Sequence, residues 1–343
     1  MWENFIGRQI RRANRNLLLV NLVVLAIVAL IAFGNWRYLN NWFRGTAAVA
    51  PAQIASLKSA DELERNFVNF DVKEVFPSGF QEVEQKNGVT TSVKADYLVT
   101  WVGDRALVVE AKVNSTNTHL EGALVAVPSE VASGLRQDLP PEKQNVLLPF
   151  MLDTVDYRED GWWMLGLGVP LILLSMWNLV KWSQRSNNLA AHPMVKKMGG
   201  EQAVIQYGQQ LETEMSGGGE KFGAATLTAN WVVVPYFFGT NFARLEDMAW
   251  VYKKVTKHSV NFIPTGKTYE AVLWNRAGAM TSVNGKEAQV DKLLATIGNR
   301  TPWVVGGFSA ELEKAWTKDR AGFLAAVDQR RANTKMASAG AHA

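Results

Sequence analysis

Cysteine is absent from this 343-residue sequence, and histidine occurs only four times. The absence of cysteine excludes disulfide bonds, thiolate metal sites and cysteine nucleophiles. No two histidines stand at the short spacing of a zinc site; they are His119, His192, His258 and His342. No Ser-His-Asp triad can be assembled from neighbouring positions, although distant residues can meet in a fold. The sequence therefore predicts no metal and no other cofactor.

Charge is absent from two long apolar runs, Leu17 to Phe33 and Met164 to Val180, each of 17 residues. With their tryptophan-rich flanks both reach about 20 residues, the length that crosses a hydrocarbon core as a helix. A buried core helix is the alternative, but it usually carries one polar stripe, and these runs are apolar nearly all round. The sequence therefore predicts transmembrane helices at 16–36 and 162–182.

Basic residues stand before the first run and after the second run. Four precede the first run and four follow the second: Arg8, Arg11, Arg12, Arg15, Lys181, Arg185, Lys196 and Lys197. The positive-inside rule then places both termini in the cytoplasm and residues 45–161 outside it. An outer domain of this size without disulfides is typical of a bacterial inner membrane, which is the predicted location.

The net charge of +4 hides an uneven distribution. Residues 45–160 carry 10 Lys and Arg against 18 Asp and Glu, whereas residues 181–343 carry 20 against 13. A basic inner part is expected beside anionic lipid headgroups. Because no arginine-rich or DNA-reading motif appears beyond the N-terminal cluster, we predict no nucleic acid partner.

The predicted fold class is an α+β membrane protein with six segments. Besides the two spans these are a cytoplasmic interfacial tail at 1–15, an extracytoplasmic α+β domain at 45–161, a cytoplasmic domain at 183–331 and a disordered tail at 332–343. The tail at 1–15 places Trp2, Phe5, Ile6 and Ile10 at helical spacing, which favours a helix lying in the membrane interface. A disordered basic tail is the alternative.

Local patterns predict the elements of both domains. In the outer domain we expect a short helix at 59–67, a hairpin around Gly103-Asp104 and a strand at 119–127. In the inner domain we expect a helix at 193–215 and a flexible loop at 216–223. Strands follow at 225–235, 248–263, 267–275, 279–285 and 302–308. Helices follow at 286–299 and 309–332, the latter capped by Ser309.

The inner domain resembles a known family. The stretches "LTANWVVVPYFF", "LEDMAWVYKK", "PTGKTYEAVLWN", "PWVVGGFSAELEKAW" and "FLAAVDQRR" are similar to the PH-like domains attached to bacterial membrane proteins. The resemblance covers residues 224–331 and implies a bent antiparallel sheet closed by a C-terminal helix. It brings no catalytic residues with it.

Gly266-Lys267-Thr268 matches the end of the phosphate-binding motif GxxxxGK[ST]. That motif needs a glycine five positions before Gly266, where this chain has Asn261, and it must lead into a helix. The following residues, "KTYEAVLW", alternate as a strand does. We therefore predict a hairpin turn and no nucleotide.

Two further groups of residues are candidate contact sites. Lys253, Lys254, Lys257 and Lys267 fall on one predicted hairpin, with His258 among them, and could meet lipid headgroups or an acidic partner; a solvated strand face is the alternative. Within the spans, Asn21 and Asn178 would seek polar partners, and Gly166 and Gly168 would allow close helix approach. Pairing within one chain or in a homodimer explains the second group equally well.

Acidic residues before the second span could hold a divalent cation, although such a cluster is more often a solvated face. They are Asp153, Asp156, Glu159 and Asp160. The sequence as a whole favours a non-enzymatic integral inner-membrane protein that binds, senses or acts as a scaffold, with a protein partner or a second copy. The alternative is an enzyme or enzyme subunit with its site in the extracytoplasmic domain. A transporter component is a third reading.

Overall fold

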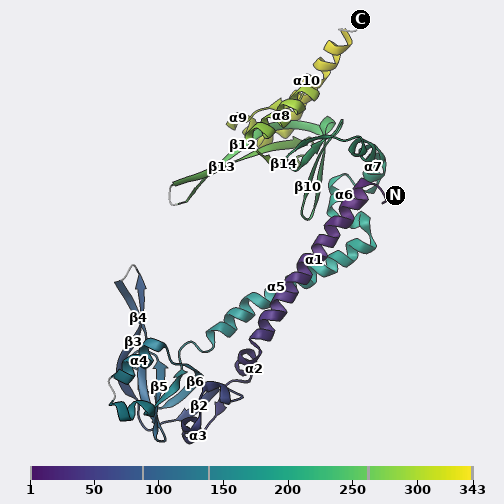
Figure 1. Cartoon of the computed structure of the whole chain (residues 1–343). Helices are drawn as coiled ribbons and strands as arrows, with labels where there is room; N and C mark the ends of the chain where they lie inside the picture. Colours follow the sequence, from purple (N-terminus) through teal and green to yellow (C-terminus); the bar gives the residue numbers. More distant parts are fainter. Residues whose placement is uncertain (1, 87–88, 138–139, 261–262, 341–343) are drawn as a thin grey trace. The chain divides into compact units, whose positions relative to one another are not determined.

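The computed structural model describes residues 2–86, 89–137, 140–260 and 263–340 (Figure 1). The chain forms two compact units, one of Met1–Leu22 with Met176–Ala343 and one of Val23–Ser175. We call them the inner and the outer unit. Together they hold α-helices and three sheets in the described residues, which confirms an α+β fold.

Two helices, α1 (Phe5–Gly34) and α5 (Glu159–Asn187), are long and apolar enough to cross a membrane. Only 6% of the most apolar window of each is buried within the protein. A core helix would bury most of that surface, so the exposure argues against the core-helix alternative. The helix α1 begins at Phe5, so the predicted tail and the first apolar run form one continuous helix.

The outer unit is built on a seven-stranded sheet with the strand order β1-β2-β6-β7-β5-β4-β3. Its strands are β1 (Ala47–Ala48), β2 (Phe67–Asp71), β3 (Phe76–Lys86), β4 (Val89–Val102), β5 (Arg105–Ala111), β6 (His119–Ala126) and β7 (Leu147–Asp153). Its shorter helices are α2 (Trp36–Arg44), α3 (Pro51–Ser56), η1 (Ala60–Glu62), α4 (Ser129–Gln137) and η2 (Pro141–Val146). One apolar cluster includes Ile54 of α3, and another includes Val131 of α4.

The predicted hairpin at Gly103-Asp104 is confirmed, since Val102 pairs with Arg105 and Gly103 has φ 66°. A left-handed φ favours glycine at this turn. The predicted helix at 59–67 is reduced to the three residues of η1. The strand β3 and the helix α4 were not predicted. β3 is largely exposed on both faces, so it lacks the apolar alternation that marks a half-buried strand.

The inner unit contains two four-stranded sheets, ordered β11-β10-β9-β8 and β14-β13-β12-β15. Their strands are β8 (Glu220–Phe222), β9 (Ala225–Leu227), β10 (Trp231–Tyr236), β11 (Gly239–Arg244), β12 (Met248–Val260), β13 (Ile263–Asn275), β14 (Met280–Gly285) and β15 (Val305–Gly306). The helices are η3 (Leu189–Ala191), α6 (Pro193–Lys197), α7 (Glu201–Ser216), η4 (Leu245–Asp247), α8 (Glu287–Arg300), α9 (Ala310–Lys318) and α10 (Arg320–Gly340).

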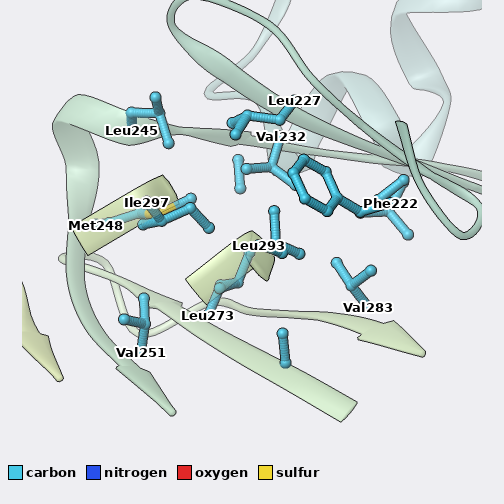
Figure 2. Packing of buried hydrophobic residues seen from close by; sticks show 14 of the residues in the cluster. Phe222, Leu227, Val232, Leu245, Met248, Val251, Leu273, Val283, Leu293 and Ile297 are labelled. Carbon is cyan, nitrogen blue, oxygen red and sulfur yellow. The ribbon is translucent and has the colours of Figure 1, made fainter. Parts of the chain in front are cut away.

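The main core of the inner unit lies between these sheets and α8. Val290, Leu293 and Ile297 are spaced at three and four residues, so they share one helix face, and all are buried. Figure 2 shows Leu293 and Ile297 facing Leu273 of β13 and the neighbouring strands. The helix that closes this core is therefore α8 and not the C-terminal helix that the resemblance led us to expect.

The C-terminal helix differs from the prediction in two ways. It is divided at Asp319 into α9 and α10, and Asp319 Oδ1 accepts a hydrogen bond from Gly322 N at 2.9 Å. Trp316 and Phe323 pack with Trp250 in a separate aromatic cluster. The cap by Ser309 is confirmed, because its Oγ accepts from Leu312 N at 3.2 Å. The helix α10 continues to Gly340, where the sequence led us to expect a disordered tail; residues 341–343 lie outside the described part.

The predicted helix at 193–215 is divided by Gly199 and Gly200, which have φ 99° and 98°. A left-handed backbone cannot continue a right-handed helix, so α6 ends and α7 starts in a new direction. The predicted strand at 225–235 is likewise two strands, β9 and β10, joined by a turn in which Thr228 N donates to Trp231 O at 2.8 Å. In both cases the apolar residues keep their spacing in the sequence although the backbone ends one helix or strand and begins another.

The imidazole of His192 caps α6 and gives the inner unit a pH dependence. Nδ1 accepts a hydrogen bond from Met194 N at 3.2 Å, and the side chain is buried. Burial, with the Arg185 charge adding, lowers the pKa of His192 to about 4. The unfolded chain therefore binds the proton more readily, so this stabilisation is present above pH 6.5 and lost as the pH falls to about 4.

We expect His192→Asn, which keeps a capping acceptor, to reduce the loss of melting temperature between pH 6.5 and 4. An unchanged loss in this variant would assign the acid sensitivity to other groups.

Candidate functional site

The four predicted contact lysines lie on the β12–β13 hairpin but not on one face of it. Lys253 and Lys254 are consecutive, so their side chains point to opposite faces of the strand. Lys253 Nζ lies 2.8 Å from Asp291 Oδ1 and 3.2 Å from Glu287 Oε1. The hydrogen bonds to these two carboxylates raise the pKa of Lys253. This lysine is paired with α8 and is not presented to an outside partner.

The other three lysines are more exposed. Lys254 Nζ lies 3.9 Å from Glu270 Oε2 across the hairpin. Lys257 stands directly opposite Lys267 in the β12–β13 register, and both side chains are exposed. Like charges in this position destabilise a sheet slightly. The predicted basic surface is therefore divided, with Lys257 and Lys267 exposed on one face of the hairpin and Lys254 exposed on the other.

The glycine-lysine-threonine motif lies within β13. Lys267 pairs with Lys257 and Thr268 with Thr256, so a strand follows Gly266 where a phosphate-binding loop requires a helix. Asn261, the position at which the motif lacks its first glycine, lies outside the described residues.

The two asparagines of the apolar runs contact each other. Asn178 Nδ2 donates to Asn21 Oδ1 at 3.1 Å, and both residues belong to the inner unit. Two turns earlier on α1, Asn14 Nδ2 donates to Ser186 Oγ at 3.0 Å. These bonds join α1 to α5 at two levels. Such bonds are worth about 0.6–2 kcal/mol each in an apolar environment.

The two glycines of α5 have open surroundings in the described structure. At Gly166 and at Gly168 an added Cβ would meet no atom within 4 Å. Gly168 lines a cavity of about 420 Å³ in the outer unit together with Val28, Ile31 and Ile172. The described chain therefore uses neither glycine for close helix approach.

The acidic residues before α5 form no metal-binding group within the described residues. Asp153 Oδ1 instead accepts from Val155 N at 2.9 Å and from Asp156 N at 3.1 Å, which fixes the turn after β7. The residues Glu159 and Asp160 occupy the first turn of α5, where negative charge is favourable. In the described structure these acidic residues therefore stabilise the turn after β7 and the start of α5.

Beside this turn lies a buried carboxyl group that the sequence did not reveal. Glu110 on β5 pairs with Tyr97 of β4 on one side and with Asp153 of β7 on the other, and it is only 8% exposed. Burial raises the pKa of Glu110 to about 8, helped by a hydrogen bond to Glu82 and by nearby carboxylates. Burial also raises the pKa of Tyr97 to about 12. Glu110 is therefore protonated at neutral pH.

The inner unit contains a polar pocket of about 370 Å³ that we call the Trp231 pocket. Its wall consists of Lys197, Met198, Gly199, Gln202, Ala203, Gln206, Tyr207, Trp231, Phe242, Arg244, Asp247 and Asn275. These residues come from α6, α7, β10, β11, η4 and the end of β13. Gly199, one of the two glycines that separate α6 from α7, lines the pocket, and Val204 and Leu211 of α7 share an apolar cluster with Trp231 and Val233 of β10.

Arg244 forms the charged side of this pocket. Its guanidinium lies over the ring of Tyr207, with 4.3 Å from Cζ to the ring centroid, and also faces Trp231. One nitrogen donates to Tyr207 Oη at 2.7 Å, and the other pairs with Glu246 Oε2 at 2.5 Å. Asp247 Oδ2 lies 3.5 Å from Nη1 of Arg244. These contacts hold the guanidinium in one orientation.

Trp231 itself carries the unusual feature of the pocket. Its side chain is 3% exposed, and the indole Nε1 has no hydrogen-bond partner among the residues that the structure describes. An indole N–H is a donor only, and a buried unpaired donor costs about 1–3 kcal/mol. Such a donor requires an explanation, and an acceptor supplied by a water or by a bound molecule is one.

The wall of the Trp231 pocket is also the surface on which α1 rests. Trp231 belongs to one apolar cluster with Ile6, Ile10, Leu211 and Val233, and both isoleucines are fully buried. The apolar stripe of the tail at 1–15 therefore packs on protein through Ile6 and Ile10, whereas the sequence led us to expect it to face a membrane interface. Arg8 strengthens the contact by pairing with Glu212 Oε1 at 2.8 Å.

Sequence reasoning did not find the residues of this pocket. Arg244 and Tyr207 are 37 positions apart, and no motif joins them. One signal was present, since the break "GG" within an otherwise helical segment indicates a change of direction, and such changes often form the rim of a pocket. Which side chains would meet there depends on the packing of α7 on the sheet.

Comparison with known proteins identifies one domain. Residues 192–316 match a family model described as a domain of unknown function (DUF6709). No curated protein matches the chain. The matched residues include the whole wall of the Trp231 pocket, from Lys197 to Asn275, so the pocket lies within the segment that is similar to this family.

Proposed function

We propose that this protein is a two-span integral membrane protein whose DUF6709 domain binds a small polar molecule and passes its occupancy to the first span. The spans would be α1 and α5, with both termini in the cytoplasm, residues 45–161 outside, and a bacterial inner membrane as the location. Support for the orientation comes from the basic residues that precede the first run and follow the second. The domain would then be cytoplasmic and PH-like in its order of strands followed by α8.

The observation that carries this proposal is the double role of Trp231. The same indole lines a pocket and packs with Ile6 and Ile10 of α1. A molecule that accepts a hydrogen bond from Nε1 would fix the ring, and the ring belongs to the apolar cluster that holds Ile6 and Ile10 of the helix. Because packed side chains move between discrete arrangements, a shift of the ring is transmitted to α1.

The wall of the pocket suggests the chemistry of the ligand. Lys197 gives the wall a positive charge that an acidic group would pair with, while Asp247 can accept hydrogen bonds from hydroxyl or amino groups elsewhere on the ligand. A volume of about 370 Å³ lies at the low end of the range for small-molecule sites. We therefore propose a small polar metabolite with a carboxylate or phosphate group.

The test is whether the purified full-length protein carries such a molecule. Small molecules released by denaturation would be identified by mass spectrometry for the wild type and for Trp231→Phe, which keeps an aromatic ring but removes the donor. We expect retention to fall about tenfold in Trp231→Phe, since one lost buried hydrogen bond is worth about 1.4 kcal/mol.

A matched control is Trp274→Phe. The Nε1 of Trp274 also lacks a partner among the described residues, but Trp274 belongs to the aromatic cluster around Trp250 and not to the pocket wall. This variant should retain the molecule as the wild type does. Equal retention in wild type and Trp231→Phe, or no molecule in any of the three, would contradict ligand binding at this pocket.

A second candidate function is favoured by Glu110. A buried carboxyl group whose pKa is raised to about 8 can serve as a general acid near neutral pH. The protein would then be an enzyme or enzyme subunit with its site in the outer unit. A reaction catalysed by purified protein and abolished by Glu110→Gln would favour this function over the binding role.

A further inference from the structure

The turn that joins β10 to β11 is made of aromatic residues. Tyr236 pairs with Gly239, which leaves Phe237 and Phe238 as a two-residue loop. Their side chains are 59% and 47% exposed, and that of Tyr236 is 45% exposed. Two-residue hairpin loops favour asparagine and glycine. The turn itself therefore gives no reason for two exposed phenylalanines.

Three contacts hold this hairpin along α1. The ring of Phe5 lies edge-on to Phe242, with 6.4 Å between centroids. Farther along α1, Thr240 Oγ1 donates to Gln9 Oε1 at 3.2 Å. At the tip, the side-chain amide of the asparagine at position 16 donates to the carbonyl oxygen of Phe237 at 2.7 Å.

The order of these contacts gives the direction of the hairpin. As α1 runs from residue 5 to residue 16, its partners run from residue 242 back to residue 237. The tip therefore points along α1 toward its apolar part, as the hairpin beside α1 in Figure 1 shows. Asn16 directly precedes Leu17, the first residue of the uncharged run. At a rise of about 1.5 Å per residue, the tip lies within a few ångströms of that boundary.

The second apolar helix marks the same level. Asn14 Nδ2 lies 3.4 Å from the carbonyl oxygen of Trp182, so Trp182 of α5 stands beside residue 14 of α1. Lys181 directly precedes Trp182, and its Nζ lies 4.9 Å from the ring centroid of Trp177. Tryptophan and lysine at the end of an apolar helix are typical of a membrane interface. The exposed aromatic turn and this belt thus occupy one level of the inner unit.

We propose that the turn Tyr236–Gly239 is an insertion tip for the lipid bilayer, with Phe237 and Phe238 entering the boundary between headgroups and acyl chains beside α1. This inference rests on the proposed membrane location of α1 and α5. The contact is apolar and buries aromatic rings, so it holds the DUF6709 domain at a fixed angle on the leaflet without depending on lysine charges. The binding therefore does not weaken with salt.

The absence of cysteine allows a direct test on the full chain. A nitroxide label would be placed on Phe238→Cys, and the protein would be reconstituted in vesicles. This substitution leaves Phe237, whose carbonyl oxygen accepts the hydrogen bond from Asn16, unchanged. Two reference labels complete the set: Ile27→Cys, 51% exposed in the apolar run, and Ala277→Cys, exposed in the β13–β14 turn of the same unit. Collision with oxygen reports lipid, and collision with a nickel chelate reports water.

The expected result is a ratio of oxygen to nickel collisions at Phe238→Cys that is clearly above that of Ala277→Cys and approaches that of Ile27→Cys. If Ile27→Cys reports lipid while Phe238→Cys matches Ala277→Cys, the insertion tip is wrong and the membrane location stands. If Ile27→Cys also reports water, the membrane location itself fails. A label at Phe238→Cys that neither reagent reaches would mean that protein covers the tip, which also overturns insertion.

Discussion

Replacing Ile10 with alanine is expected to destabilise the inner unit by about 2–5 kcal/mol, the usual cost of removing a fully buried isoleucine side chain. Ile10 is 0% exposed and packs with Trp231 and Val233 of the sheet. The lost methyl groups would leave a cavity between α1 and the domain. Amide hydrogen exchange in detergent micelles should become faster in α7 and β10, and the melting temperature of the inner unit should fall.

The control for this prediction is Leu19→Ala on the same helix. Leu19 is 51% exposed, so its truncation removes no core contact within the protein. Exchange in α7 and β10 should then stay as in the wild type. If Ile10→Ala behaved like Leu19→Ala, α1 would not be part of the domain core, and the proposed route from the Trp231 pocket to the span would be lost.

Replacing Glu110 with glutamine is expected to make the outer unit less sensitive to alkaline pH. The pKa of Glu110 is raised from 4.5 to about 8, chiefly by burial, so the folded state holds a proton that the unfolded chain releases. Its stabilising effect is complete below pH 4.5 and is lost as the pH rises to about 8. The slope is at most about 1.4 kcal/mol per pH unit for one proton. Glutamine is neutral throughout, so the variant should lose this slope and be more stable than the wild type at pH 8.

The titratable groups around Glu110 do not reverse this expectation. Burial raises the pKa of Asp156 as well, with Glu159 and Asp153 adding, so Asp156 contributes in the same direction. Glu130→Gln on the exposed face of α4 is the matched control and should leave the pH dependence unchanged. Chemical unfolding of the outer unit at several pH values measures both variants. A wild type whose stability does not fall between pH 4.5 and 8 would contradict a protonated Glu110.

Much of the local structure could be predicted because neighbouring residues decide it. The turn at Gly103-Asp104 needs only a glycine at a left-handed position between two alternating runs, and the cap at Ser309 needs only a hydroxyl beside a free amide. The division of the helix at 193–215 was missed for a related reason. The apolar spacing continues through Gly199 and Gly200, and that spacing was given more weight than the two glycines that interrupt it.

The candidate site was not predictable in the same way. Glu110 follows the apolar residues 106–109 of β5, where a charged residue on a solvated face would look the same in the sequence. Its pKa depends on Glu82, Asp153 and the depth of burial, which only the pairing of β5 with its neighbours fixes. The four lysines of the β12–β13 hairpin were grouped from their closeness in the sequence, but consecutive side chains of a strand point to opposite faces, so they do not form one surface.

The sequence by itself determined that two helices are long and apolar enough to cross a membrane, because length and the absence of charge are properties of consecutive residues. It also determined that the stripe of Ile6 and Ile10 must be covered, but not by what. An amphipathic helix buries its apolar side equally well in a membrane interface or on a protein core, since both remove the same surface from water. Only the tertiary structure decided for the core, by presenting Trp231, Leu211 and Val233 at matching positions. That choice places Ile6 and Ile10 in one apolar cluster with Trp231 of the pocket wall.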